Sequence, residues 1–320
     1  MHQLTTSLYL KKWLLAALFV GNFLAFEGSS ANASEAPRVV ASIVPVHGLV
    51  SRVMDGVGEP QLLIAGTISP HAYNLKPSGA RKLDAADAVF WIGPQLEAAL
   101  ARPIEALAGS AMVVSLMKDR DRGVDLLSRR KGGLLALDNN HDHDHGDADS
   151  ADPHIWLNPQ NAAAMLLNIA EVLAGIDPGN AHVYLTNAHD AIQEMEILSA
   201  TILRRLMEHN VAGRSFIFFH DAYQYFEHRF DISPAAIIQV DPEHAPGAKR
   251  VASIRNFIEG SKAVCVYSEP QYDPKLISTL IEGTEARHAK LDPVGQEIEL
   301  GKNLYNEMML AFVDDFLGCL

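Results

Sequence analysis

The chain lacks a long apolar stretch beyond its N-terminus, and no later segment is apolar over the roughly 20 residues that a membrane span needs. It is also short of basic residues, with 26 Lys and Arg against 39 Asp and Glu and a formal net charge of −13. This acidic balance argues against nucleic acid or anionic lipid as a partner and is compatible with a cationic ligand. With 48% hydrophobic and 20% charged residues over 320 positions, the composition indicates a globular protein large enough for two domains.

The N-terminus is typical of a secretory signal peptide. Two lysines at positions 11 and 12 precede an apolar run over residues 13–26, and an Ala-Asn-Ala motif follows at 31–33. We therefore expect residues 1–33 to be removed by cleavage between Ala33 and Ser34; the alternative, a retained membrane anchor, would need a longer apolar run. Because no cysteine near this point could carry a lipid, the mature protein is expected to be free in the periplasm.

Cys265 and Cys319 are the only two cysteines of the chain. An even number in an exported protein favours a disulfide, and two buried thiols are the alternative. The disulfide would close a loop of about 55 residues, for which the chain-entropy model gives a stabilisation of about 4 kcal/mol. It would also tether the C-terminal tail.

Short β-branched runs alternate with helical stretches in two sets. The first set of runs covers residues 38–46, 61–65, 88–92 and 112–116, with helical stretches at 48–54, 77–86 and 95–107. The second set covers 215–219, 235–240, 263–268 and 289–292, with helical stretches at 222–230, 247–260, 274–283 and 301–317. This alternation is typical of βαβ units. We predict an α/β fold with two lobes, each built on a four-stranded, mainly parallel sheet flanked by helices.

One long helix is expected between the two sets. Asp177 can cap it, and Pro178 can take its first position, where a missing N–H costs nothing. Apolar residues then recur at helical spacing, and no Gly or Pro interrupts them before Gly213. The predicted domains are therefore an N-terminal lobe over 34–176, a rigid linking helix over 177–210 and a C-terminal lobe over 211–320.

The segment 131–152 breaks the pattern of strands and helices. It is polar, acidic and without periodicity, which indicates a flexible loop. His141, His143 and His145 alternate with aspartates in it, and such imidazoles can hold a borderline metal weakly and exchange it quickly. We predict an auxiliary, weak metal site there; the alternative is a solvated linker with chance histidines.

Three of the 14 histidines are candidate metal ligands because of where they stand. His71 follows the second strand, His154 precedes a helix, His220 ends the fifth strand, and Asp292 ends the eighth. In open parallel sheets, ligands bind beyond the carboxyl ends of the strands. If the two lobes face each other there, three imidazoles and one carboxylate form a tetrahedral set suited to Zn²⁺. Each histidine taken alone is as compatible with a surface residue, and Glu269 is a weaker candidate oxygen ligand than Asp292.

Several stretches, in this order, resemble the metal-binding proteins of bacterial ABC importers, specifically the zinc-uptake branch. They are 69–78 (SPHAYNLKPS), 91–94 (WIGP), 154–159 (HIWLNP), 219–223 (FHDAY), 246–248 (PGA), 268–271 (SEPQ) and 291–295 (LDPVG). The resemblance implies two α/β lobes joined by a long helix, with zinc held between them by His71, His154 and His220. It also implies delivery of Zn²⁺ to an importer permease in the inner membrane with its cytoplasmic ATPase, by a protein expected to be monomeric. Zinc members are similar, too, in their acidic His-rich loop and in a cysteine pair matching this chain's two cysteines.

The chain departs from this family at Pro70. Some zinc members carry Glu directly before the first histidine and can use it as the fourth ligand. Here the fourth position falls to Asp292 or to water, and Asp292 is the tentative choice. Manganese-type relatives tend to carry a carboxylate where His220 stands, as expected for a metal that prefers oxygen.

Other functions are compatible with the same residues. A manganese or iron carrier, or a surface adhesin, could share the fold, and a zinc hydrolase could hold its metal with three histidines and a water. A hydrolase also needs a general base near the metal, and no HExxH motif supplies one. We therefore expect a Zn²⁺ carrier that is not an enzyme.

Overall fold

The computed structural model describes residues 35–118, 122–130, 151–239 and 248–320. The predicted signal peptide and nearly all of the segment 131–152 lie outside these residues. The chain from Ala36 to Leu320 forms one compact unit. Among the described helices, none is both long enough and apolar enough to cross a membrane.

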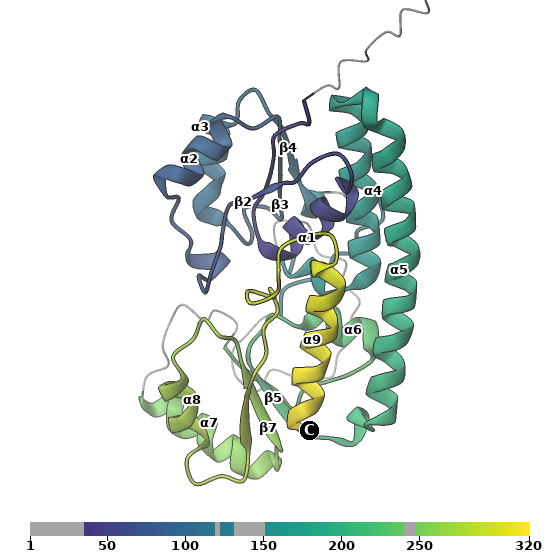
Figure 1. The fold of residues 1–320 in the computed structure, drawn as a ribbon. Helices are drawn as coiled ribbons and strands as arrows, with labels where there is room; N and C mark the ends of the chain where they lie inside the picture. The colour runs from purple at the N-terminus through teal and green to yellow at the C-terminus, as the bar shows by residue number, and fades with distance from the viewer. Residues whose placement is uncertain (1–34, 119–121, 131–150, 240–247) are drawn as a thin grey trace, which may run out of the picture. The chain divides into compact units, whose positions relative to one another are not determined.

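The N-terminal part of this unit contains a parallel sheet covered by helices (Figure 1). Its strands are Val39–Ala41 (β1), Gln61–Leu62 (β2), Ala88–Trp91 (β3) and Met112–Ser115 (β4). Its helices are Val44–Val53 (α1), Pro77–Asp84 (α2) and Ala101–Leu107 (α3). The strand order is β2-β1-β3-β4. β1 and β3 are buried along their whole length because they are the inner strands of a parallel sheet whose faces are covered by helices.

The C-terminal part repeats this design. Its strands are Phe216–His220 (β5), Ala236–Gln239 (β6), Cys265–Ser268 (β7) and Arg287–Lys290 (β8). Its helices are Gln224–Phe230 (α6), Ala248–Ser261 (α7) and Pro274–Ile281 (α8). The strand order is β6-β5-β7-β8, again all parallel, so the two lobes share one topology. The predicted α/β fold with two parallel four-stranded sheets is confirmed.

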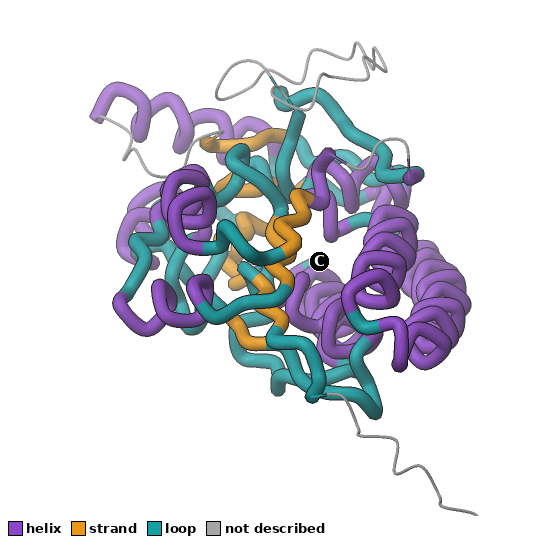
Figure 2. The backbone as a smooth tube through the Cα atoms, turned by 90° about the horizontal axis from the view of Figure 1, so that it is seen from above, coloured by secondary structure: helices purple, strands orange, loops and turns teal. Residues whose placement is uncertain are grey.

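Between the strands of the first sheet and those of the second, the chain forms a hairpin of two helices, Pro159–Ile176 (α4) and Ala181–Glu208 (α5). They lie side by side in both views (Figures 1 and 2). At 1.5 Å per residue, the 28 residues of α5 span about 42 Å. Its buried positions recur at helical spacing: Tyr184, Ala188, Ala191, Met195, Leu198, Ser199, Ile202 and Leu206. This stripe packs α5 against α4, α1 and the C-terminal helix, as a long helix joining two lobes requires.

The start of the long helix differs from the prediction. Residues Pro178–Asn180 form a 3₁₀ turn, and Asp177 caps no backbone N–H of α5. Its Oδ2 instead accepts hydrogen bonds from Asn180 Nδ2 at 2.7 Å and from Tyr184 Oη at 2.8 Å. Asp177 therefore closes the α4–α5 connection through side chains, because the tight 3₁₀ turn separates it from the first turn of α5.

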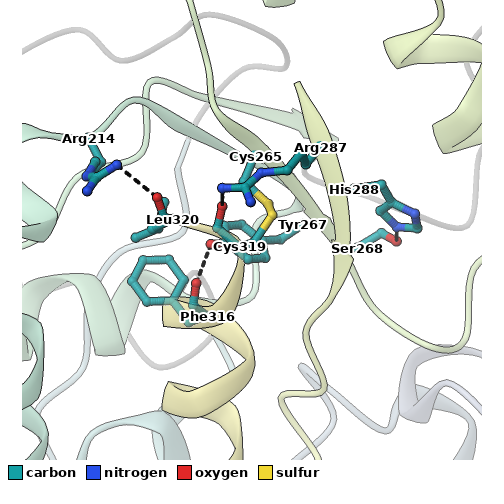
Figure 3. Close-up of a disulfide and its surroundings, with 9 residues drawn as sticks. All are labelled: Arg214, Cys265, Tyr267, Ser268, Arg287, His288, Phe316, Cys319 and Leu320. Carbon is teal, nitrogen blue, oxygen red and sulfur yellow. Dashed lines mark hydrogen bonds between the residues drawn. A yellow bond between two sulfur atoms is a disulfide. The ribbon is translucent and has the colours of Figure 1, made fainter. Parts of the chain in front are cut away.

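The C-terminal helix Leu304–Cys319 (α9) also connects the two lobes. Its first turn packs on α1, where a Cβ on Gly48 would come within 2.9 Å of Leu304 Cδ2, so the close approach depends on this glycine. Its last turn is joined to β7 by the disulfide Cys265–Cys319, with a Cα–Cα distance of 6.0 Å (Figure 3). The predicted disulfide is confirmed, and it anchors α9 to the second sheet.

The first predicted strand, 38–46, is too long. β1 ends at Ala41, and α1 begins at Val44 with Pro45 in its first turn. Proline is well suited to that position because its φ is preset for a helix and its missing N–H would have no partner there. Of the β-branched residues after Ala41, Ile43 is the extended N-cap of α1, and Val44 and Val46 lie in the helix. The short β1 therefore ends at the carboxyl edge of the sheet sooner than predicted.

Candidate metal centre

Three histidines from separate parts of the chain meet where the two lobes face each other. His71 lies in the 3₁₀ turn Pro70–Ala72 after β2, His154 precedes the 3₁₀ turn Ile155–Leu157, and His220 is the last residue of β5. One ring nitrogen of each lies within 4.8 Å of the others, and the Nε2 atoms of His71 and His154 are 3.3 Å apart. Facing nitrogens at such distances can share one ion with Zn–N bonds of about 2.0 Å.

The three imidazoles line one small cavity. His154 is 5% exposed and His220 is 4% exposed, and the cavity between them measures about 20 Å³. Its lining consists of Ser69, Pro70, His71, His154, Trp156, His220, Glu269, Gln271, Tyr272, Pro293 and Val294. This volume accommodates one ion or one water molecule and excludes an organic ligand.

Two buried carboxylates orient two of the three rings. Asp152 Oδ1 accepts hydrogen bonds from His154 Nδ1 at 2.7 Å and from His154 N at 3.0 Å. Glu269 Oε1 lies 3.2 Å from His220 Nδ1 and accepts a hydrogen bond from Tyr223 Oη at 2.8 Å. A proton held on Nδ1 leaves the lone pair of Nε2 free, so each carboxylate turns the metal-binding nitrogen of its histidine toward the cavity.

The electrostatics of the rings favour a cation. Burial lowers the pKa of His154 well below its ordinary value, and the neighbouring His220 acts in the same direction. Burial also lowers the pKa of His220, but the attraction and hydrogen bond of Glu269, with Asp221 and Asp152, outweigh it and raise that pKa overall. Asp152 and Glu269 carry a formal charge of about −2 when ionised, which a divalent cation would neutralise.

Asp292 does not join the three histidines. β8 ends at Lys290, and Asp292 lies in the turn that follows. There its Oδ1 accepts a hydrogen bond from Val294 N at 3.0 Å, and its Oδ2 accepts one from Gln296 N at 2.7 Å. Both oxygens are thus used by the turn, and Asp292 is absent from the cavity lining. Glu269, which the sequence ranked below it, is the carboxylate that lines the cavity, and its buried Oε2 has no hydrogen-bond partner among the residues that the structure describes.

Sequence reasoning missed the role of Asp152. Its signal was its place in the Asp-Pro-His sequence at 152–154, because a carboxylate two residues before a histidine can accept from both its backbone and its ring. His141, His143 and His145 lie outside the described residues, and the auxiliary weak site there stays a prediction.

Comparison with known proteins places the chain in a family. Residues 39–319 match the family model of the zinc-uptake complex component A, periplasmic, also called ZnuA. The chain belongs to this family. The high-affinity zinc uptake system protein ZnuA of Brucella abortus is 38% identical, over 96% of this chain and 98% of that protein. The protein of the same name from Paracoccus denitrificans is 35% identical, over 90% and 93%.

Solved structures share the fold. A crystal structure of ZnuA aligns with a TM-score of 0.72 at 21% identity, over 89% of this chain and 99% of that one. The periplasmic zinc-binding protein TroA from Treponema pallidum aligns with a TM-score of 0.71 at 19% identity, over 89% and 99%. Membership of the ZnuA family confirms the resemblance drawn from the motifs and the prediction of a solute-binding component of zinc uptake. A manganese or iron carrier and a zinc hydrolase are not favoured.

Proposed function

We propose that this chain captures Zn²⁺ in the periplasm with His71, His154 and His220 and delivers it to the permease of an ABC importer. The observation that carries the proposal is the set of three imidazole nitrogens within 4.8 Å of one another around one small cavity. Membership of a zinc-uptake family supports an ABC importer as the partner, and we propose that it consists of a permease and a cytoplasmic ATPase. Acting as a monomer, the chain would present its metal from a lobe over 34–176 and a lobe over 211–320, joined by the helix 177–210.

The ligand chemistry favours zinc among divalent cations. Three neutral nitrogens suit a borderline metal such as Zn²⁺, whereas Mn²⁺ prefers a site richer in oxygen. The buried carboxylates Asp152 and Glu269 support their histidines from behind and offset the charge of the ion. With Asp292 held in its turn by two backbone N–H groups, we assign the fourth position to water.

Transport, not catalysis, agrees with the cavity. A zinc hydrolase needs space beside the metal for a substrate as well as a water molecule. The cavity of about 20 Å³ gives little room for a substrate, which supports a carrier over a hydrolase.

Calorimetric titration of the mature protein, stripped of metal with a chelator, tests the proposal. The wild type should bind one Zn²⁺ tightly, and His154→Ala should weaken this binding at least about a hundredfold, because the loss of one of three protein ligands removes a direct metal bond. His189→Ala is the matched control, since His189 is exposed on α5 far along the chain from the ligands. Tight binding that persists in His154→Ala, or that is lost equally in His189→Ala, would refute the assignment.

A further inference from the structure

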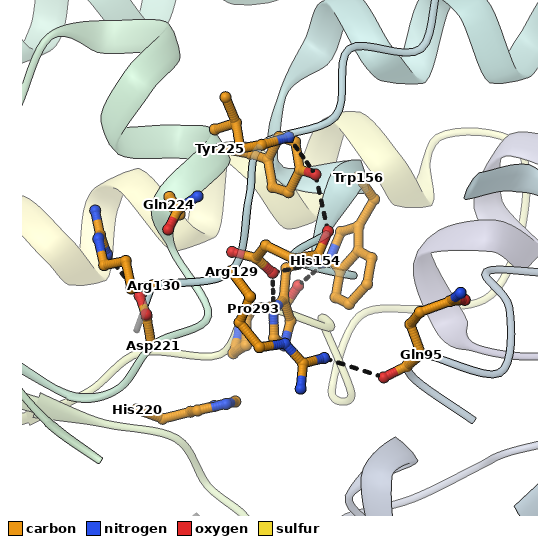
Figure 4. A network of polar contacts seen from close by, with 12 residues as sticks. Gln95, Arg129, Arg130, His154, Trp156, His220, Asp221, Gln224, Tyr225 and Pro293 are labelled. Atoms are coloured by element: carbon orange, nitrogen blue, oxygen red, sulfur yellow. Dashed lines mark hydrogen bonds and ion pairs between the residues drawn. The ribbon is translucent and has the colours of Figure 1, made fainter. Parts of the chain in front are cut away.

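A buried ion cluster connects the two lobes beside the metal centre. The guanidinium of Arg130 donates from Nη1 to Asp221 Oδ1 at 2.6 Å (Figure 4). It also donates from Nη2 to Glu227 Oε2 at 2.6 Å. A third contact joins Nη1 to Glu227 Oε1 at 3.3 Å. Asp221 is 7% exposed and Glu227 is 4% exposed. Arg130, whose side chain is 25% exposed, therefore forms a two-armed contact with one buried carboxylate and a single contact with the other.

Both sides of this cluster lead directly to metal ligands. On one side, Asp221 follows His220 in the chain. On the other, the segment that ends in Arg130 lies beside the segment that carries Asp152: Asp152 N donates to Leu127 O at 2.9 Å. Asp152 in turn holds the ring of His154. The cluster is thus joined to His220 through the neighbouring residue Asp221, and to His154 through the backbone contact of Leu127 with Asp152.

Helix α6 fastens the same two segments to the second lobe. Tyr225 Oη donates to Asp152 O at 2.8 Å and accepts from Leu127 N at 3.1 Å. Gln224 Nε2 donates to Ser128 O at 2.8 Å. Glu227, the two-armed partner of Arg130, belongs to this helix. Arg130 is the charged end of a polar contact surface that joins α6 to the residues around His154.

We propose that Arg130 is a positioning residue of the metal centre: it holds His220 in register with His154 by tying Asp221 and α6 to the segment that bears Asp152. The proposal rests on the zinc-binding function proposed above. The guanidinium is suited to this role because its planar donors fit two carboxylates in a fixed geometry, which the ammonium group of lysine cannot reproduce.

The sign of one measurement separates positioning from simple charge. Arg130 is a cation near a cation site, so if it acted only through its charge, its removal would tighten zinc binding. If it positions the ligands, its removal lets His220 and His154 drift apart and weakens binding despite the lost repulsion. Arg129 provides the matched control because it is adjacent and exposed, and its charge also acts on His154. Its Nη2 donates a hydrogen bond to Gln95 O at 3.3 Å and does not contact Asp221 or Glu227 (Figure 4).

The experiment measures Zn²⁺ affinity by competition with a chromophoric chelator for the full mature chain and its variants. Arg130→Met should weaken binding about tenfold or more, as the loss of groups that orient metal ligands commonly does. Arg130→Lys should recover only part of that loss, because it restores charge without the two-armed contact. Arg129→Met should change affinity by no more than about threefold, as expected for an exposed charge. Affinity in Arg130→Met equal to or above that of the wild type overturns the proposal, as does an equal loss in Arg129→Met.

Co²⁺ substitution supplies a readout that a purely structural role would not change. The visible absorption of bound Co²⁺ reports ligand geometry, so saturated Arg130→Met should give a shifted or weakened band, while Arg129→Met keeps the wild-type spectrum. A wild-type spectrum in Arg130→Met, together with wild-type affinity, would leave Arg130 no positioning role.

Two further variants keep the test decisive. If Arg130→Met does not fold, the isosteric Glu227→Gln weakens one arm of the contact and should still lower zinc affinity; unchanged affinity there overturns the proposal. His154→Ala measured in parallel separates the two claims. Binding lost in His154→Ala but intact in Arg130→Met contradicts only the role of Arg130, and binding intact in His154→Ala contradicts the zinc site itself.

Discussion

The buried carboxyl of Glu97 should make the stability of this protein depend on pH. Glu97 is 1% exposed, at the carboxyl ends of β1 and β3. Its Oε1 accepts a hydrogen bond from Ser42 Oγ at 2.5 Å, and its Oε2 accepts one from Gly93 N at 3.0 Å. These bonds favour the ionised form, but burial outweighs them and raises the pKa of Glu97 from 4.5 to about 7.

The direction of the effect follows from this raised pKa. Between the two values the folded protein holds a proton that the unfolded chain has released, so folding is favoured at low pH. The contribution of Glu97 to stability is fully present below 4.5 and is lost as pH rises through about 7. The difference between the two pKa values corresponds to about 3 kcal/mol of unfolding free energy. About 2.5 kcal/mol of this is lost between about pH 5 and about pH 8.

Urea unfolding of the metal-free protein at these two pH values measures the effect. Glu97→Gln cannot titrate, so its loss of unfolding free energy on going to the higher pH should be about 2.5 kcal/mol smaller than that of the wild type, or about 1 M urea in the midpoint. The comparison is between the two proteins because Glu227, whose pKa burial also raises to about 7, contributes equally to both. Identical pH dependence in Glu97→Gln and the wild type would refute the reasoning.

Two further outcomes follow from the contacts around the metal centre and the C-terminal helix. Asp152→Asn replaces the carboxylate behind a metal-binding ring by a neutral amide, and should weaken zinc binding at least about tenfold in a calorimetric competition titration; unchanged affinity would contradict the orienting role. Replacing Cys265 and Cys319 together by alanine should lower the unfolding free energy by about 4 kcal/mol in urea. Zinc affinity should change little in that variant, because Cys265 is at the opposite end of β7 from the metal centre, and a large loss would show that the disulfide also shapes the site.

The sequence predicted the architecture well because that information is local. Alternating β-branched runs and helical stretches report the period of each element, and two sets of four runs with helices between them leave few arrangements other than two parallel sheets. The elements lie close to their predicted places, and the main exception is the first strand. The β-branched residues of 38–46 fit a strand pattern throughout, but only Val39–Ala41 form a strand. From Val44 on the chain is helical, because Pro45 suits the first turn of a helix and α1 packs against the sheet.

The candidate site likewise has residues that the sequence could name and residues that only the fold could reveal. His71, His154 and His220 could be named from the sequence because each stands at an element end, and parallel sheets bring such ends to one edge. The choice between Asp292 and other oxygen donors could not be made this way. It depends on backbone N–H groups two and four residues further on, which occupy both oxygens of Asp292.

The sequence by itself determined the two α/β lobes, the long helix, the three histidines and the single possible cysteine pair. Only the tertiary structure decided which carboxylates stand behind the histidines and that Arg130 joins Asp221 and Glu227 across the lobes. The physical reason is the distance along the sequence over which each interaction acts. Periodicity and turn chemistry act over a few residues and are written in neighbouring positions, whereas a contact such as that of Arg130 with Glu227, 97 residues apart, depends on side-chain directions set by the whole packed fold.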